Sequence, residues 1–270
     1  MLSLGAATFT YLNQFSFDES LDHLAELGFK YLELMTAPPH FFPRNMSTAQ
    51  RLETRRAIQS KGLTLYSLQP TYMDLNIISL NPAIRAESIK QVKENIELTG
   101  ELGGRLLVLV TGRRHLLLPA SFEVSWQLAL DAIRECSETA RRSGVKIGVE
   151  NVRNQFVDRG ADVKTLVDDL ADDNIKGVID VANANVVEDP LSALDAVRDD
   201  LILVHLSDND GKAWTHSRVG QGNIDFQAVA DKIRDIGYQG PCILEVTDDQ
   251  DPKGTMARSK EVLAQYGFLP

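Results

Sequence analysis

Cysteine and histidine are scarce in this chain, which has two cysteines and five histidines among 270 residues. Cys136 falls on the apolar side of a predicted helix, and Cys242 falls inside a predicted strand. Neither position suggests a disulfide framework or a thiolate zinc site. We therefore expect a reduced, cytoplasmic protein.

Long apolar runs and excess positive charge are also absent. No segment approaches the roughly 18 consecutive apolar residues of a membrane span. The opening MLSLGAATFTYL has no basic leader, and we interpret it as a first strand rather than a signal peptide. The formal net charge is −10, whereas nucleic-acid affinity comes largely from Lys and Arg that neutralise phosphates. These absences argue against a membrane or a nucleic acid as partner.

Short β-like runs alternate with amphipathic helical runs along the whole chain. Several of the β-like runs, such as RLLVLV and LILVHL, are almost continuously apolar, which is typical of parallel strands buried on both faces. The predicted strands are Leu2–Thr8, Tyr31–Leu34, Leu63–Leu68, Leu106–Val110, Lys146–Val149, Gly177–Asp180, Leu201–Leu206 and Cys242–Val246.

Local signals mark the ends of the helices between these strands. Ser16 and Glu19 have the spacing of a capping box, and the longest predicted helix runs from about Phe122 to Arg142. A glycine commonly follows each helix, as expected for a left-handed C-terminal turn: Gly28, Gly62, Gly103, Gly144, Gly177 and Gly237.

Eight β-then-α units without a change of composition predict a single domain, residues 1–270, with a parallel sheet. A doubly wound open sheet is the competing architecture. The chain contains neither GxGxxG nor GxxxxGK[ST], and no Gly-rich phosphate turn follows the first strand. We therefore predict an α/β fold of the closed (β/α)8 TIM barrel type.

Polar residues end the last four predicted strands. The segments KIGVEN, GVIDVAN, LILVHLSD and PCILEV supply Glu150, Asp180, His205 and Glu245. In a (β/α)8 barrel the active site forms at the C-terminal ends of the strands, so these four side chains should lie close together. A structural carboxylate network is the alternative interpretation of the same pattern.

Three carboxylates beside a barrel core would repel one another unless a positive charge lay between them. A divalent cation supplies that charge. Oxygen ligands with one imidazole suit Mn2+, Mg2+ or Co2+ better than a structural zinc. The pattern thus predicts one divalent metal ion held by Glu150, Asp180, His205 and Glu245.

The segments VEN, ID-V-A-N, VHLSD and LEV resemble those of the sugar phosphate isomerase/epimerase superfamily, the xylose isomerase-like barrels. The resemblance covers nearly the whole chain and implies one ion of the Mn2+ type, with Mg2+, Co2+ or Zn2+ as alternatives. It also implies that Glu150 and Glu245 are the acid/base pair. The implied reaction is proton abstraction next to the carbonyl of a small ketose, sugar phosphate or hydroxy-keto acid, through a metal-stabilised enediolate.

The resemblance also indicates substrate-binding residues. The superfamily often has D-x-x-H after the strand-6 Asp, and here Asn183 replaces that histidine, so proton transfer at this position is lost. Arg218, before VGQGNID, matches an arginine that reaches a substrate oxygen. Glu33 and Gln69 end the second and third strands, and His216 is a further candidate.

Other polar and aromatic residues near strand ends are candidates for secondary roles. Asp208 could orient a metal ligand, and the Arg113–Arg114 pair could receive an anionic group. Residues that could form the wall of the site are Tyr11, Tyr72, His115 and Trp214.

Several functions stay open at this point. A dehydratase of the inosose or dehydroshikimate type would use the same scaffold but expel a β-hydroxyl. Endonuclease IV shares the fold, yet its zinc site needs more histidines than this chain offers. A binding barrel without catalysis is a further alternative. Relatives are commonly dimers or tetramers, so we expect a homo-oligomer that acts on a small-molecule sugar or keto acid.

Overall fold

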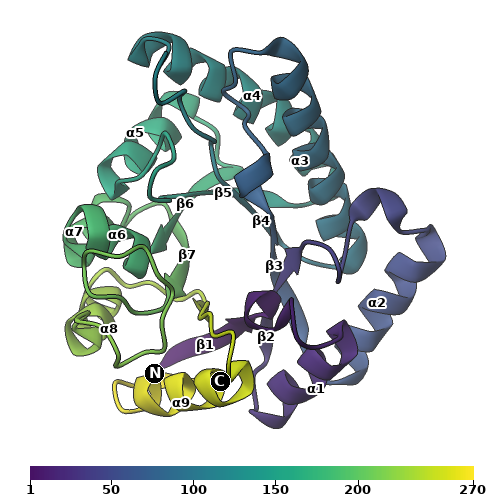
Figure 1. Cartoon of the computed structure of the whole chain (residues 1–270), viewed down its shortest axis with the longest axis vertical. Helices are drawn as coiled ribbons and strands as arrows, with labels where there is room; N and C mark the ends of the chain where they lie inside the picture. The colour runs from purple at the N-terminus through teal and green to yellow at the C-terminus, as the bar shows by residue number, and fades with distance from the viewer.

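Eight parallel strands close into a barrel in the computed structural model, which describes the backbone of residues 1–270 and every side chain except that of Met73 (Figure 1). The first strand pairs with the second on one side and with the eighth on the other, which closes the ring. The strands are β1 (Leu2–Ala7), β2 (Tyr31–Thr36), β3 (Thr64–Pro70), β4 (Leu106–Leu109), β5 (Lys146–Glu150), β6 (Ile175–Asp180), β7 (Leu201–Leu206) and β8 (Cys242–Leu244).

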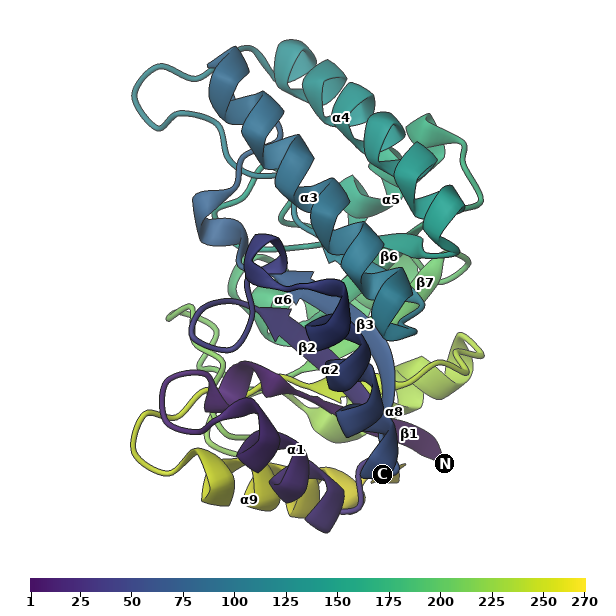
Figure 2. The ribbon, with the colours of Figure 1, turned by 90° about the vertical axis from the view of Figure 1, so that its right-hand side faces the viewer.

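The helices form an outer layer around this ring, and the two termini lie near each other (Figures 1 and 2). They are α1 (Phe17–Glu26), α2 (Thr48–Ser60), α3 (Pro82–Leu102), α4 (Phe122–Ser143), α5 (Gly160–Leu170), α6 (Val181–Val187), α7 (Pro190–Ala196), α8 (Phe226–Asp235) and α9 (Pro252–Ala264). Short 3-10 turns occur at Thr8–Tyr11, Pro43–Asn45 and Tyr72–Asp74. Within the described part of the chain, no helix is long and apolar enough to cross a membrane.

The predicted barrel is confirmed, and each of the eight strands lies within two residues of its predicted bounds. A short ninth strand, β9 (Phe268–Leu269), pairs with β1 outside the barrel and was not predicted. Both cysteines are buried and unpaired, as expected.

The helix-end signals are largely confirmed. Ser16 and Glu19 form the complete capping box of α1. Five of the six glycines have a left-handed φ, but Gly177 lies inside β6, so its predicted role was wrong. Ala171 adopts the left-handed turn after α5 instead, with φ of 50°.

A layer of apolar side chains fills the barrel interior and sets the floor of the site. Val178, Leu203 and Ile243 belong to this layer, on three successive strands. Because side chains on a strand alternate between faces, the residue two positions further along points the same way. Those residues are Asp180, His205 and Glu245, so the alternation places them inside the barrel at the carboxyl ends of β6, β7 and β8.

The absence of a side chain at Gly148 leaves room in the barrel interior for side chains from β4 and β6. A Cβ at Gly148 would lie 2.5 Å from Val178 Cγ2 and 3.2 Å from Leu106 Cδ1. We predict that Gly148→Ala lowers the free energy of unfolding by about 1–3 kcal/mol, the usual cost of overpacking a core. Urea denaturation measures this loss.

The cause is tested by a double-mutant cycle with Val178→Ala, which removes the methyl that the new Cβ would meet. The two substitutions together should cost less than the sum of their separate effects. Additive costs would show that the clash with Val178 is not the reason for the glycine.

Candidate active site

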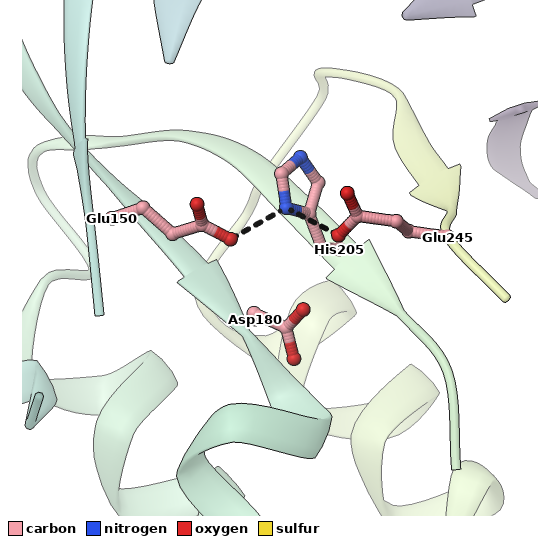
Figure 3. Close-up of side chains that lie close together, drawn as sticks. All are labelled: Glu150, Asp180, His205 and Glu245. Carbon is pink, nitrogen blue, oxygen red and sulfur yellow. Dashed lines mark hydrogen bonds and ion pairs between the residues drawn. The ribbon is translucent and has the colours of Figure 1, made fainter. Parts of the chain in front are cut away.

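Glu150, Asp180, His205 and Glu245 converge at the C-terminal ends of the last four barrel strands. Each offers one ligand atom, and these atoms all lie within 4.8 Å of one another. All four side chains are buried. Figure 3 shows Glu150 and Glu245 approaching from opposite sides, with the His205 ring between them and Asp180 to one side. The predicted convergence of the four residues is therefore present, and the cluster could hold a metal ion.

Both ring nitrogens of His205 face carboxylates. Nδ1 lies 2.8 Å from Glu150 Oε1 and 3.4 Å from Glu245 Oε2, while Nε2 lies 3.2 Å from Glu33 Oε2. Burial opposes a charge on the ring, but the surrounding carboxylates outweigh burial and raise the pKa of His205 well above its usual value. The contact with Glu33 would keep a proton on Nε2 and leave Nδ1 available to a cation.

The two glutamates that face each other hold protons more tightly than ordinary carboxyls. Burial raises the pKa of Glu150, and repulsion from neighbouring carboxylates adds to the effect, although His205 opposes it. Burial likewise raises the pKa of Glu245 well above its usual value, again against the influence of His205. A divalent cation between these carboxylates would take the place of those protons.

The two oxygens of Asp180 have different environments. Oδ1 accepts a hydrogen bond of 2.7 Å from the backbone N–H of Asn183, so it caps α6. Oδ2 is buried and has no hydrogen-bond partner among the described residues. A buried carboxylate oxygen without a partner is costly, and a bound cation is one group that would satisfy it.

A cavity of about 140 Å³ opens beside the cluster. Its polar lining consists of Gln69, Thr71, Glu150, Asn183, His216 and Glu245. Its apolar and aromatic lining consists of Phe9, Met35, Pro70, Tyr72, Val110, Val152 and Trp214. Three of the five predicted substrate-binding residues, Gln69, Asn183 and His216, therefore border this cavity.

Hydrogen bonds hold these three side chains in place. Gln69 Nε2 donates to Glu150 Oε2 at 3.1 Å. Trp214 Nε1 donates to Asn183 Oδ1 at 2.6 Å, which fixes the indole beside the cavity. His216 Nδ1 lies 3.0 Å from Ser207 Oγ and 3.6 Å from Asp180 Oδ2.

Glu33 and Arg218 are not among the residues that line the cavity. Glu33 is buried against His205, and its Oε2 also accepts a hydrogen bond of 2.6 Å from Ser67 Oγ, whereas its Oε1 has no hydrogen-bond partner among the described residues. One oxygen of Glu33 is thus engaged by Ser67 and His205, and direct substrate contact by Glu33 stays a prediction. The side chain of Arg218 is half-buried in the loop between β7 and α8.

The remaining candidates have structural roles or lie elsewhere. Asp208 accepts hydrogen bonds of 2.9 Å from the backbone N–H groups of Gly220 and Gly222, so it shapes the β7–α8 loop. Tyr11 is buried against His23. A separate hollow of about 660 Å³, beside the β4–α4 loop, is bordered by Arg113, Arg114 and His115 and shares no residue with the cluster.

Much of the apolar wall was not predicted. Phe9 follows β1, Val110 follows β4 and Val152 follows β5, so the strand-end rule could have found all three. Val110 and Val152 are aliphatic, so their chemistry does not distinguish them from core residues, and Phe9 lies in a short 3-10 turn beyond the strand.

Comparisons with known proteins agree with the barrel fold. A family model described as xylose isomerase-like TIM barrel matches residues 21–266. L-ribulose 3-epimerase of Mesorhizobium japonicum is 27% identical over 61% of this chain and 56% of its own length. The uncharacterized protein MJ1311 of Methanocaldococcus jannaschii is 25% identical over 98% of this chain and 89% of its own. A solved D-tagatose 3-epimerase-like structure has the same fold, with a TM-score of 0.86 and 24% identity over 98% of this chain and 97% of its own.

The raised pKa values predict how stability changes with pH when divalent ions are removed by a chelator. The folded cluster binds protons more tightly than the unfolded chain does, so the free energy of unfolding should fall as pH rises above about 4.5, the ordinary pKa of a glutamate. Glu245→Gln removes one of the titrating groups. Denaturation between pH 5 and 8 should therefore show wild type losing stability relative to Glu245→Gln as pH rises. A difference that stays constant across this range would contradict the proton-sharing description.

Proposed function

Because this chain belongs to the xylose isomerase-like TIM barrel family, we propose that it is a metal-dependent isomerase or epimerase. Its substrate would be a small ketose, sugar phosphate or hydroxy-keto acid. The observation that carries the proposal is the convergence of three carboxylates and one imidazole within 4.8 Å, beside a cavity at the barrel rim. The relationship to an L-ribulose 3-epimerase supports the same class of reaction.

The donor set fits one divalent ion. Three carboxylates and an imidazole suit Mn2+, Mg2+, Co2+ or Zn2+, and we propose Mn2+ as the preferred ion. Asp180 Oδ2 is the buried oxygen that lacks a partner, and His205 Nδ1 faces the same centre. When bound, the ion would polarise the substrate carbonyl and stabilise the negative charge that develops when the neighbouring carbon loses its proton.

We propose that Glu150 and Glu245 exchange that proton. They come from β5 and from the end of β8 and face each other across the centre of the cluster (Figure 3). One carboxylate would remove the proton from one face of the carbon, and the other would return a proton to the opposite face, which inverts the configuration. Gln69 holds one oxygen of Glu150 by a hydrogen bond and so fixes its orientation.

Conservative substitution of either glutamate tests this assignment. Glu150→Gln and Glu245→Gln should each reduce exchange of the substrate proton with solvent deuterium by about 10²–10⁴-fold, the usual contribution of a positioned acid or base. Nuclear magnetic resonance of keto sugars in D2O follows the exchange, and deuterium uptake without loss of water separates an epimerase from a dehydratase. Glu261→Gln, an exposed carboxylate on α9, is the matched control and should behave as wild type. Exchange retained in both active-site variants would refute the acid/base pair.

Glu33 is proposed to position a metal ligand. Its carboxylate contacts Nε2 of His205 on the side of the ring away from Glu150. Loss of such a partner typically lowers metal affinity by about 10–100-fold. Calorimetric titration of the metal-free protein with Mn2+ should therefore show one site per chain and a weakening of this size in Glu33→Gln. Unchanged affinity in that variant would remove Glu33 from this role.

A further inference from the structure

Among the residues that the structure describes, His216 is the one basic side chain that lines the cavity beside the cluster. No lysine or arginine of the described chain lines it. Arg113 and Arg114 border the separate hollow at the β4–α4 loop. Arg153, next to the wall residue Val152, donates to the carbonyl oxygen of Lys212 at 2.9 Å. Recognition of phosphate or carboxylate in proteins usually depends on such cations, so this cavity lacks the expected partner for an anionic group.

The cluster itself disfavours an anionic substrate. Glu33, Glu150, Asp180 and Glu245 bring four carboxyl groups into one buried region, and an anionic substrate would add a further negative group there. Charges of the same sign repel strongly where water is excluded. A phosphate or carboxylate on the substrate would therefore lie near these carboxyl groups, with no lysine or arginine of the described cavity lining beside it.

One uncharged hydrogen-bond acceptor in the cavity lining has no partner within the described part of the chain. Gln69 Oε1 is buried without a hydrogen-bond partner among the described residues, so it can accept a hydrogen bond from a substrate hydroxyl. In contrast, the hydroxyl of Tyr72 donates to the carbonyl oxygen of Val108, and the hydroxyl of Thr71 donates to the carbonyl oxygen of Thr36 at 3.2 Å. Gln69 therefore offers an acceptor for a substrate hydroxyl beside Glu150, whose carboxylate it contacts.

The rest of the cavity wall is apolar, and the cavity is small. Phe9, Met35, Pro70, Val110 and Val152 give it a hydrocarbon surface, and Trp214 is held beside it by its bond to Asn183. The volume of about 140 Å³ is below the range of roughly 300–1,000 Å³ that is usual for drug-sized ligands. The cavity therefore suits a small molecule with a polar reacting end and few further polar groups.

We infer that, within the function proposed above, the substrate is a free, uncharged ketose and not a ketose phosphate or a hydroxy-keto acid. Deoxy-ketoses, which carry a methyl group in place of a terminal hydroxyl, fit the apolar wall well. This inference rests on the proposed function and selects one of its three substrate classes.

Matched substrate pairs test the inference on the Mn2+-loaded protein. The pairs are D-ribulose with D-ribulose 5-phosphate, and D-fructose with D-fructose 6-phosphate; a 6-deoxy-ketohexose and hydroxypyruvate complete the panel. Proton exchange in D2O should give kcat/KM at least about tenfold higher for each free sugar than for its phosphate. Calorimetric binding should rank the ligands in the same order, which supplies a readout that does not depend on turnover.

The outcomes distinguish failure of the substrate inference from failure of the proposed isomerase or epimerase function. Exchange that is equal or faster with the phosphates, or with hydroxypyruvate, would overturn the inference while leaving the isomerase or epimerase function in place. No exchange with any member, by protein that has bound Mn2+, would overturn the proposed function and the inference with it.

A pair of variants at the cavity tests the electrostatic reason. Trp214→Lys and Trp214→Gln both remove the indole and its bond to Asn183, but only the first adds a cation. The ratio of kcat/KM for phosphate over free sugar should rise in Trp214→Lys relative to Trp214→Gln. An equal ratio in the two variants would overturn the electrostatic explanation of the preference.

Discussion

Repulsion among buried carboxylates is the constraint on which the rest of the site depends. Glu150, Asp180 and Glu245 lie around one point in a region closed to solvent, with His205 as the neighbouring positive group. Burial and mutual repulsion raise the pKa of the two glutamates, so in the absence of a cation the cluster is stabilised by retained protons. The unsatisfied oxygen of Asp180 points to the same conclusion, because a buried carboxylate oxygen without a partner is costly. A divalent cation would satisfy all of these groups together.

The barrel architecture produces this crowding through strand alternation. Apolar residues such as Leu203 fill the interior, and the next inward-facing position on the same strand carries the polar group, in this case His205. Beside the cluster, Ser67 donates a hydrogen bond to Glu33 Oε2, and the same oxygen contacts Nε2 of His205 and orients the ring. Above it, the backbone of the β7–α8 loop is held by Asp208. The site is thus built from rigid strands with one ordered loop beside it.

The sequence alone predicted the barrel, its eight strands and the convergence of the four central residues. Buried parallel strands are nearly continuous apolar runs, so a polar residue at the end of such a run is conspicuous. The sequence could not distinguish depth within the barrel. Glu33 and Gln69 were both predicted to end strands, but β2 continues beyond Glu33 to Thr36, and Glu33 contacts His205 whereas Gln69 lines the cavity. Loop residues were harder still, because Trp214, His216 and Arg218 are close in sequence but only the first two border the cavity.

The central claim is that these four side chains bind one divalent cation. The most direct measurement is anomalous X-ray diffraction from crystals soaked in Mn2+. We expect one anomalous peak per chain, about 2.0–2.3 Å from an atom of each of Glu150, Asp180, His205 and Glu245. Crystals that show no peak at this position, or a peak only at a surface carboxylate elsewhere, would contradict it.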